Sequence, residues 1–396
     1  MRILFCWEFG GGLGHVYRIL PVGAEFLKQG CEVILAAAGL NPALKRQFPE
    51  FSFVQPPAWE LPPQPLPLSQ NYGENLLKNG YRDADSLRKH LNAWAGLMDS
   101  HQPDLVVAEH APTALIAARS KGIPRAAMGT GFSMPPLTDP MPGLQPWFKI
   151  PDQLLGLKEQ KFLDTVNPVL KSAGCAPLAS VADIFQESDR LLCTYPEFDH
   201  YPARENMPYQ GPVVYSSPDI KPQWPSESHD NVFLYLNSDN RFLLPILAQL
   251  KILGLPVLAY IPGLTDLERQ SMERSRLRII PDPVNLADAG QRCRFAVSQG
   301  GHNTGALMLL QGVPLLLCPR QMEQAIWAYR IEEQDLGVMF SFFDQEPDYK
   351  RKIETILSSD RVRNRVRTLS IKYGRPDPRK RVEQLASRCI KSAETG

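Results

Sequence analysis

The sequence of 396 residues lacks paired cysteines, a long apolar run and a clear signal for export. Its seven cysteines are scattered and no C-x-x-C spacing occurs, so neither a disulfide framework nor a zinc site is expected. No window approaches the roughly 18 apolar residues of a membrane-spanning helix. The apolar start ends at Glu8, too early for a signal peptide. We therefore expect a soluble, cytoplasmic protein.

An excess of charge of either sign is also missing. The chain has 43 Lys and Arg residues against 42 Asp and Glu residues, a net charge of +1, which argues against nucleic-acid binding through bulk positive charge. A hydrophobic fraction of 43% is enough to bury a sizeable core and excludes a disordered or fibrous chain. At roughly 100 to 200 residues per domain, the length suggests two domains, or three small ones.

Proline is the residue in excess, with 37 in the chain. The clusters at Pro49–Pro67 and Pro135–Pro151 predict long ordered loops without helix. A third cluster, Met207–Pro225, separates two apolar halves and is interpreted as an interdomain linker. The predicted division is a first domain at 1–211, a linker at 212–228, a second domain at 229–375 and a C-terminal helix at 376–396.

Each half of the chain repeats the order strand, turn, helix, glycine, strand. In the first half, runs at 2–7, 32–36, 104–109 and 123–128 predict strands, with helices after Val16 and over 112–120. In the second half, strands are predicted at 232–236, 256–260, 294–298 and 313–318, with helices over 242–252 and 303–311. Such alternation predicts an α/β protein with two doubly wound domains facing each other across a cleft. Ligands should bind at the carboxyl ends of the strands.

The glycine-rich turn Gly10–Gly14 does not match a dinucleotide site. That site needs G-x-G-x-x-G, but His15 stands at the third glycine position. The acidic residue expected for the ribose is missing as well, because the second strand runs into Ala36–Gly39. No G-x-x-x-x-G-K-[ST] occurs, so a P-loop is excluded too.

His15 and Glu109 form the first candidate site. His15 follows a predicted strand where a helix begins, and Glu109 ends an apolar strand, so both should emerge at the same sheet edge. A carboxylate bonded to one imidazole nitrogen fixes the tautomer of a general base. His110 is an alternative partner, although strand alternation would point it to the other side. The structural alternative is that Glu109 caps the helix beginning near Pro112.

The second candidate site is the turn Ser298–Thr304. Its two glycines allow close approach of the backbone to a ligand, and Asn303 and Thr304 are good N-cap types for a helix that ends at Gly312. Free N–H groups at the positive end of a helix dipole suit phosphates. An ordinary capped helix is the structural alternative.

Both sites together resemble one known family. The stretch Gly300–Thr304, followed by Gly312–Pro314, Glu323-Gln324 and Leu336–Val338, resembles the donor signature of the UDP-glycosyltransferase family, and Gly12–Val16 resembles its catalytic loop. The resemblance implies two-domain enzymes of the GT-B fold, such as plant flavonoid and bacterial macrolide glycosyltransferases. It also implies that the C-terminal helix crosses back to the first domain, which would bind the acceptor while the second binds the donor.

The resemblance further implies a role for each matching residue. His15 would be the general base, supported by Glu109. The residues that would bind the donor are Gly12, Ser238, Val284, Gln299, Gly300, Gly301, His302, Asn303, Thr304, Glu323 and Gln324. The implied reaction transfers a sugar from a nucleoside diphosphate to a hydroxyl of a small or lipid-like acceptor, with inversion and without a metal or other cofactor.

Four residues depart from the family pattern. Gln299 replaces the usual His, and Leu307 stands where a Glu usually holds the ribose hydroxyls. Pro283 replaces a stacking aromatic residue, and Trp327 replaces a common Asn. These changes weaken the case for UDP and leave three alternatives open: a thymidine-diphosphate donor, an unusual set of contacts to the ribose, or a degenerate donor site.

Rival functions and a peripheral membrane contact also stay open. The rivals are a glycosyltransferase-like protein that binds a sugar nucleotide without turnover, a sugar-nucleotide epimerase and, as the weakest, an oxidoreductase. Basic residues from Arg361 to Arg381 flank Val362, Val366 and Leu369 at helical spacing, which predicts an amphipathic helix with a solvated cationic face. Contact of that face with an anionic membrane is the alternative.

Overall fold

The computed structural model describes residues 1–10, 14–40, 42–59, 68–186, 188–202, 204, 206–213, 221–285, 289–341, 343–374 and 377–395. Internal contacts divide the chain into two compact units, one formed by Met1–Val213 with Pro378–Gly396 and the other by Val214–Asp377. Each unit has its own parallel sheet and its own buried core.

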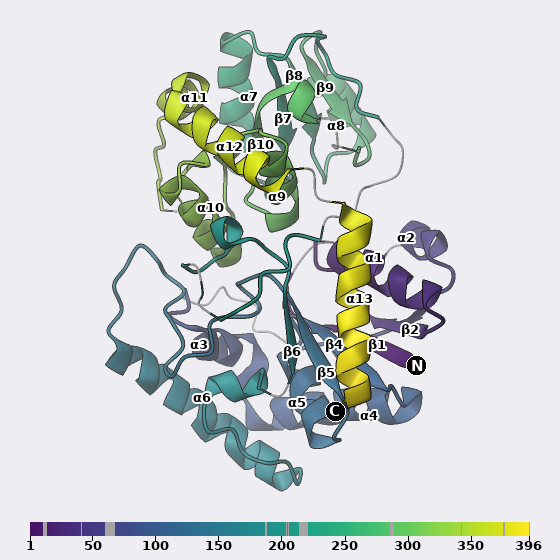
Figure 1. The fold of residues 1–396 in the computed structure, drawn as a ribbon. Coiled ribbons are helices and arrows are strands. Elements are labelled where there is room, and N and C mark those ends of the chain that lie inside the picture. Colours follow the sequence, from purple (N-terminus) through teal and green to yellow (C-terminus); the bar gives the residue numbers. More distant parts are fainter. Residues whose placement is uncertain are drawn as a thin grey trace. The chain divides into compact units, whose positions relative to one another are not determined.

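The first unit is built on a six-stranded parallel sheet. Its strands are β1 (Arg2–Trp7), β2 (Glu32–Ala36), β3 (Ser52–Val54), β4 (Leu105–Glu109), β5 (Arg125–Gly129) and β6 (Asp189–Leu192). They lie in the order β3-β2-β1-β4-β5-β6, and all of them except β3 are labelled in Figure 1. The interior of β1 is apolar without alternation because helices bury both of its faces.

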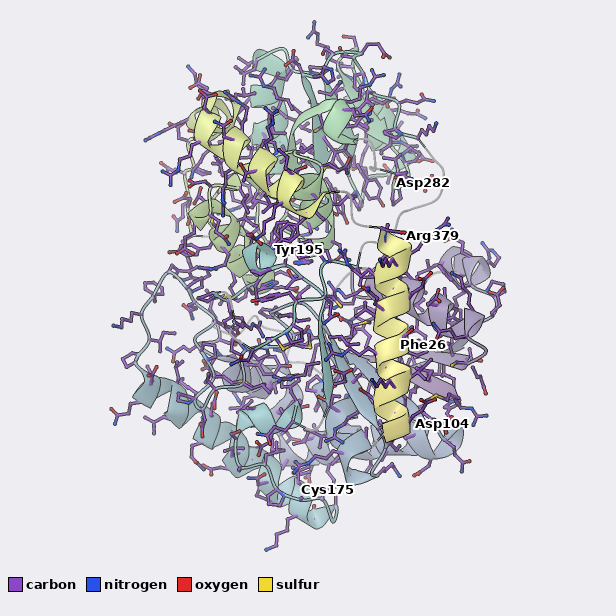
Figure 2. The ribbon with its side chains drawn as sticks, in the orientation of Figure 1. Phe26, Asp104, Cys175, Tyr195, Asp282 and Arg379 are labelled. Atoms are coloured by element: carbon purple, nitrogen blue, oxygen red, sulfur yellow. The ribbon has the colours of Figure 1, made fainter. Side chains whose placement is uncertain are left out.

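Two layers of helix cover this sheet. They comprise α1 (Val16–Lys28), α2 (Pro42–Gln47), α3 (Tyr72–Leu76), α4 (Ala84–His101), α5 (Pro112–Ser120), α6 (Asp152–Ser172) and α13 (Pro378–Thr395). On one face, Phe5 packs with α1 and α13, and its ring centroid lies 5.9 Å from that of Phe26. Phe26, which belongs to α1, is labelled in Figure 2. On the other face, Leu4 and Cys6 join a core with α4, α5 and α6.

The C-terminal helix α13 belongs to the first unit, although 164 residues of the second unit precede it. Its buried side chains, Val382, Leu385, Ala386 and Cys389, enter the core beside α1. Arg388 holds both carboxylate oxygens of Asp189 in β6, at 2.5 and 2.9 Å. The helix therefore packs directly against α1, the helix that follows the glycine-rich turn.

The second unit repeats this plan. Its strands are β7 (Asn231–Tyr235), β8 (Val257–Tyr260), β9 (Leu277–Ile280), β10 (Cys293–Ser298), β11 (Leu315–Leu317) and β12 (Gly337–Met339), in the order β12-β11-β10-β7-β8-β9. Its helices are α7 (Leu243–Ile252), α8 (Asp266–Met272), α9 (His302–Leu310), α10 (Met322–Glu333), α11 (Tyr349–Ser358) and α12 (Asp360–Tyr373). Counted within each unit, both sheets have the strand order 3-2-1-4-5-6 of doubly wound folds.

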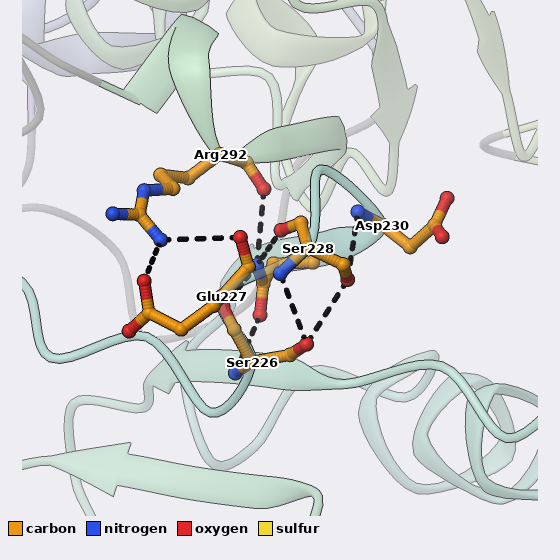
Figure 3. A network of polar contacts seen from close by, with 6 residues as sticks. Ser226, Glu227, Ser228, Asp230 and Arg292 are labelled. Atoms are coloured by element: carbon orange, nitrogen blue, oxygen red, sulfur yellow. Dashed lines mark hydrogen bonds and ion pairs between the residues drawn. The ribbon is translucent and has the colours of Figure 1, made fainter.

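A polar network closes the amino end of the second sheet. Asn231, at the start of β7, donates from its Nδ2 atom to the carbonyl oxygens of Ser226, Ser228 and Arg292. Figure 3 labels these three acceptor residues together with Glu227 and Asp230. The guanidinium of Arg292 in turn binds Glu227. Because this network lies where β7 begins, it leaves the carboxyl ends of the strands to other residues.

The predicted α/β class is confirmed, and the strands at 2–7 and 32–36 have the predicted bounds. Two predictions need correction. The Pro49–Pro67 segment was expected to be a loop, but β3 lies within it. The helix predicted from Asn303 begins at His302, with Gly301 as its N-cap. Among the helices that the structure describes, none combines the length and apolar character needed to cross a bilayer.

Candidate active site

Both candidate sites lie at the point where the strand order of a sheet reverses. In the first unit this point lies between β1 and β4, and in the second unit between β7 and β10. Loops leaving two strands at such a point go to opposite sides, which opens a crevice for ligands. His15 follows β1 and Glu109 ends β4, while Ser238 follows β7 and Gln299 follows β10. The topology thus groups most of the predicted residues into two pairs of loops.

In the first unit, His15 and Glu109 are in contact. The Nδ1 atom of His15 lies 2.7 Å from Oε1 of Glu109. The strands bring them together because Glu109 is paired with Trp7, the last residue of β1. Glu109 is fully buried and His15 is 8% exposed. With its proton on Nδ1 facing the carboxylate, the imidazole keeps the Nε2 lone pair for another group.

The backbone around His15 limits how its ring can lie. The ring stacks on Trp7 at 5.4 Å between centroids and 21° between planes. Gly10 has a φ of +103°, and a Cβ added there would stand 2.4 Å from Nε2 of His15. Glycine at position 10 is therefore required twice, by its left-handed backbone and by the imidazole beside it.

One side chain near His15 was not recognised in the sequence, and a second was expected on the wrong side of the strand. Arg18, 4% exposed, donates from Nη1 to the same Glu109 oxygen at 2.5 Å. Its spacing of three residues from His15 at the start of a helix was the available signal, because such residues share a face. His110 was expected to point away, yet its ring centroid lies 6.0 Å from that of His15. The φ of His110 is +48°, so strand alternation no longer applies to it.

The role of helix cap, considered above for Glu109, belongs to Glu8. Its carboxylate accepts from the backbone N–H of Thr113 at 2.9 Å and from the Thr113 hydroxyl at 2.5 Å, at the start of α5. The same carboxylate accepts from Nε1 of Trp59 at 2.7 Å and lies 3.0 Å from His90. This second buried network ties the segment before residue 60 to the end of β1.

In the second unit, the turn after β10 leads directly into the N-terminus of α9. Gly300 has a φ of +84°, and Gly301 precedes α9 as an N-cap without a side-chain cap. Asn303 and Thr304 therefore lie in the first turn of the helix rather than at its cap. The helix dipole gives this end a partial positive charge, which favours phosphate oxygens.

Neighbouring loops pack against this turn. A Cβ added to Gly300 would lie 3.0 Å from the carbonyl oxygen of Gln324, and the Gln324 side chain accepts from the backbone N–H of Arg320. Gln299 donates to Asn237 at 3.4 Å, and Ser238 is the next residue after Asn237. Glu323 and Gln324 lie in the first turn of α10. Loops after β7, β10 and β11 thus meet at one edge.

Other predicted donor residues stand apart or outside the described part of the chain. Val284 is buried after β9, the edge strand, two strands away from β7. Gly12 lies outside the described residues.

His302 is buried, with its ring 5.9 Å from that of Trp327, and Leu307 is half-buried one turn further along α9. Gly305 makes room for the Trp327 ring, since an added Cβ would lie 2.1 Å from it. In the part of the chain that the structure describes, no group of three or more His, Cys, Asp or Glu side chains is placed to hold a metal ion.

Comparison with solved structures defines the fold. The chain is similar, over 100% of both chains, to the glycosyltransferase VinC in complex with DTDP, with a TM-score of 0.70 and 16% identity. It is also similar to the spinosyn rhamnosyltransferase SpnG complexed with thymidine diphosphate, with a TM-score of 0.65 and 16% identity over 97% of this chain and 100% of that one. The chain has the GT-B fold, as the sequence resemblance predicted. Both of these structures are of glycosyltransferases.

Curated relatives by sequence are glycosyltransferases as well. A PGL/p-HBAD biosynthesis glycosyltransferase of Mycobacterium tuberculosis is 24% identical over 95% of this chain and 89% of its own length. A PGL/p-HBAD biosynthesis rhamnosyltransferase of Mycobacterium bovis is 27% identical over 68% of this chain and 64% of its own. An inactive PGL/p-HBAD biosynthesis glycosyltransferase of Mycobacterium bovis is 25% identical over 77% of this chain and 81% of its own. No protein-family model matches the chain.

Proposed function

We propose that this protein transfers a sugar from a nucleoside-diphosphate sugar to a hydroxyl of a small or lipid-like acceptor, with inversion at the anomeric carbon. The observation that carries the proposal is the contact of 2.7 Å between His15 Nδ1 and Glu109 Oε1 where the strand order reverses. A carboxylate on Nδ1 holds the imidazole in the tautomer that can take a proton at Nε2.

In the proposed reaction, Nε2 of His15 accepts the proton of the acceptor hydroxyl. The hydroxyl oxygen forms the new bond to C1 of the sugar, and the bond from C1 to the leaving diphosphate breaks with its electron pair moving to the phosphate oxygen. Attack from the face opposite the diphosphate inverts the anomeric centre. The N-terminus of α9 behind Gly300 and Gly301 stabilises the charge that develops, and this supports a metal-independent mechanism.

For the donor, we propose a thymidine-diphosphate sugar over a UDP sugar. Leu307 stands where the resembling family holds the ribose hydroxyls, and an aliphatic side chain cannot accept a hydrogen bond from a 2′-hydroxyl. The sugar of thymidine is 2′-deoxyribose, which lacks that hydroxyl. The presence of DTDP or thymidine diphosphate in two similar structures agrees with this choice.

The proposal is tested by His15→Gln together with a panel of nucleotides. We expect TDP to raise the melting temperature of the wild type more than UDP, GDP or ADP do. We expect His15→Gln to keep this TDP shift and to lose transfer by at least about 100-fold. His229→Gln, at an exposed position, is the matched control and should retain transfer. Transfer by His15→Gln at the wild-type rate would exclude His15 as the base.

A sugar-nucleotide-binding protein without turnover is the second candidate. Gln299 and Leu307 remove two groups that the resembling family uses on the donor, and one relative carries the name of an inactive enzyme. Under this alternative, TDP binds but the wild type neither transfers the sugar nor hydrolyses the donor. Product analysis with a radiolabelled sugar nucleotide distinguishes the two candidates.

A further inference from the structure

Two side chains of one helix segment meet the same buried oxygen. Arg18 Nη1 donates to Glu109 Oε1 at 2.5 Å, and His15 Nδ1 lies 2.7 Å from that oxygen. The two residues are three positions apart, so they share one face at the start of α1. Arg18, His15 and Glu109 are all buried. They form one cluster centred on a single carboxylate oxygen.

The two basic groups of this cluster differ, because the guanidinium of Arg18 is always charged whereas the imidazole of His15 can be neutral. A fully buried carboxylate needs a counter-charge, because its desolvation is otherwise uncompensated. A guanidinium is always protonated, so Arg18 supplies that charge whatever the state of His15. With a neutral side chain in place of Arg18, the Glu109 carboxylate would instead favour a proton on the His15 imidazole. A protonated imidazole cannot accept the proton of a hydroxyl.

Two titratable groups on the neighbouring elements, His110 and Cys193, carry no charge that replaces Arg18. His110 faces His15 from the end of β4, and burial, together with the charges of His15 and Arg18, lowers its pKa to about 3. Cys193, just after β6, is fully buried, and burial raises the pKa of its thiol to about 12. Both are therefore neutral between about pH 5 and pH 9.

The other charged groups that the structure describes near this end of the sheet, Glu8 and Arg381 among them, have partners of their own. Glu8, after β1, is held by Thr113 and Trp59. Arg381 of α13, the helix packed on α1, donates to the hydroxyl of Tyr195 and to the carbonyl of Pro212, each at 2.6 Å. The charge next to His15 therefore comes from the ion pair of Glu109 and Arg18.

We propose that Arg18 is a positioning residue that holds the Glu109 carboxylate and, by supplying its counter-charge, leaves the His15 imidazole neutral and ready to accept a proton. This inference rests on the proposed function for its catalytic meaning. The effect of Arg18 on the protonation of His15 is a property of the protein alone, so it can be measured without any substrate.

The test follows the His15 side chain directly. In protein labelled at histidine, the His15 imidazole resonance is assigned by its loss in His15→Gln and followed with pH by NMR. We expect Arg18→Met to move its transition to higher pH by about one unit, a tenfold change in the protonation equilibrium. Arg18→Gln keeps a donor but not the charge and should move it similarly, which covers the case that Arg18→Met does not fold. Arg18→Lys restores the charge and should reverse most of the shift.

Lys28→Met, an exposed cation of the same helix, is the matched control and should leave the transition in place. In transfer assays, the acid limb of kcat in Arg18→Gln should move upward with the NMR transition. A His15 transition at the wild-type pH in both neutral variants would overturn the inference, whatever their activity. A shifted transition in a protein whose wild type transfers no sugar would leave the inference intact and refute the proposed function.

Discussion

His15 and Glu109 are 94 positions apart in the chain, yet their side chains lie 2.7 Å from each other. The contact exists because β1 and β4 are neighbours in the sheet, with Trp7 and Glu109 in register. A histidine after the first strand and a carboxylate at the end of the fourth therefore meet at the point where the strand order reverses. The same relation in the second unit brings the loops after β7 and β10 together.

Gly10→Ala tests the space around the imidazole. The substitution places a methyl group 2.4 Å from Nε2 of His15 and forces an alanine to adopt a φ near +103°. We expect the ring to be displaced and sugar transfer to fall by about 100-fold. Gly30→Ala is the control, because Gly30 has a φ of +77° but no atom within 4 Å of the added methyl group. Equal activity of the two variants would show that Nε2 is not required.

Gly300→Ala tests the proposed anion site. Its added methyl group lies 3.0 Å from the Gln324 carbonyl oxygen, so the turn before α9 must shift. We expect Kd for TDP, measured by calorimetry, to rise by at least about tenfold, or about 1.4 kcal/mol. Gly254→Ala has a comparable φ of +65° with no atom within 4 Å and should bind TDP normally. Unchanged affinity in Gly300→Ala would place the phosphates elsewhere.

Glu159 makes the first unit sensitive to pH. Burial raises the pKa of this carboxyl from 4.5 to about 7, and its Oε1 atom accepts from the backbone N–H of Met141 at 2.9 Å. The folded protein thus holds a proton that the unfolded chain releases, so stability is present below pH 4.5 and is lost as pH rises to about 7. Urea unfolding gives the difference in free energy of unfolding between Glu159→Gln and the wild type. We expect this difference to favour the variant more at pH 8 than at pH 5. Asp164→Asn, exposed on the same helix, should show no such difference.

Arg388→Ala tests the attachment of α13. The substitution removes both bonds to Asp189, whose side chain is only 9% exposed. We expect the free energy of unfolding of the first unit to fall by about 1–2 kcal/mol, reduced because the Arg388 side chain is itself 37% exposed. Arg294→Ala breaks an exposed pair with Asp230 in the second unit and should cost less than about 1 kcal/mol. Urea unfolding measures both, and an equal loss in the two variants would contradict this account.

The sequence carried much of the fold because its signals are local. The apolar run Arg2–Trp7, the glycine that ends α1 and the helix from Pro112 each follow from a few consecutive residues. Strand β3 was missed because three residues in a proline-rich segment give too little pattern. The predicted direction of the His110 side chain was wrong because its left-handed backbone breaks the alternation of a strand.

By itself, the sequence determined the two parallel α/β halves, the glycine turns and the residues His15, Glu109 and Gly300 as candidates. The tertiary structure alone decided that Arg18 shares an oxygen with His15, that Glu8 rather than Glu109 caps α5, and that α13 packs on α1. The reason is physical. Periodicity and turn chemistry act between residues a few positions apart, whereas these contacts join segments that only strand order and helix packing bring together.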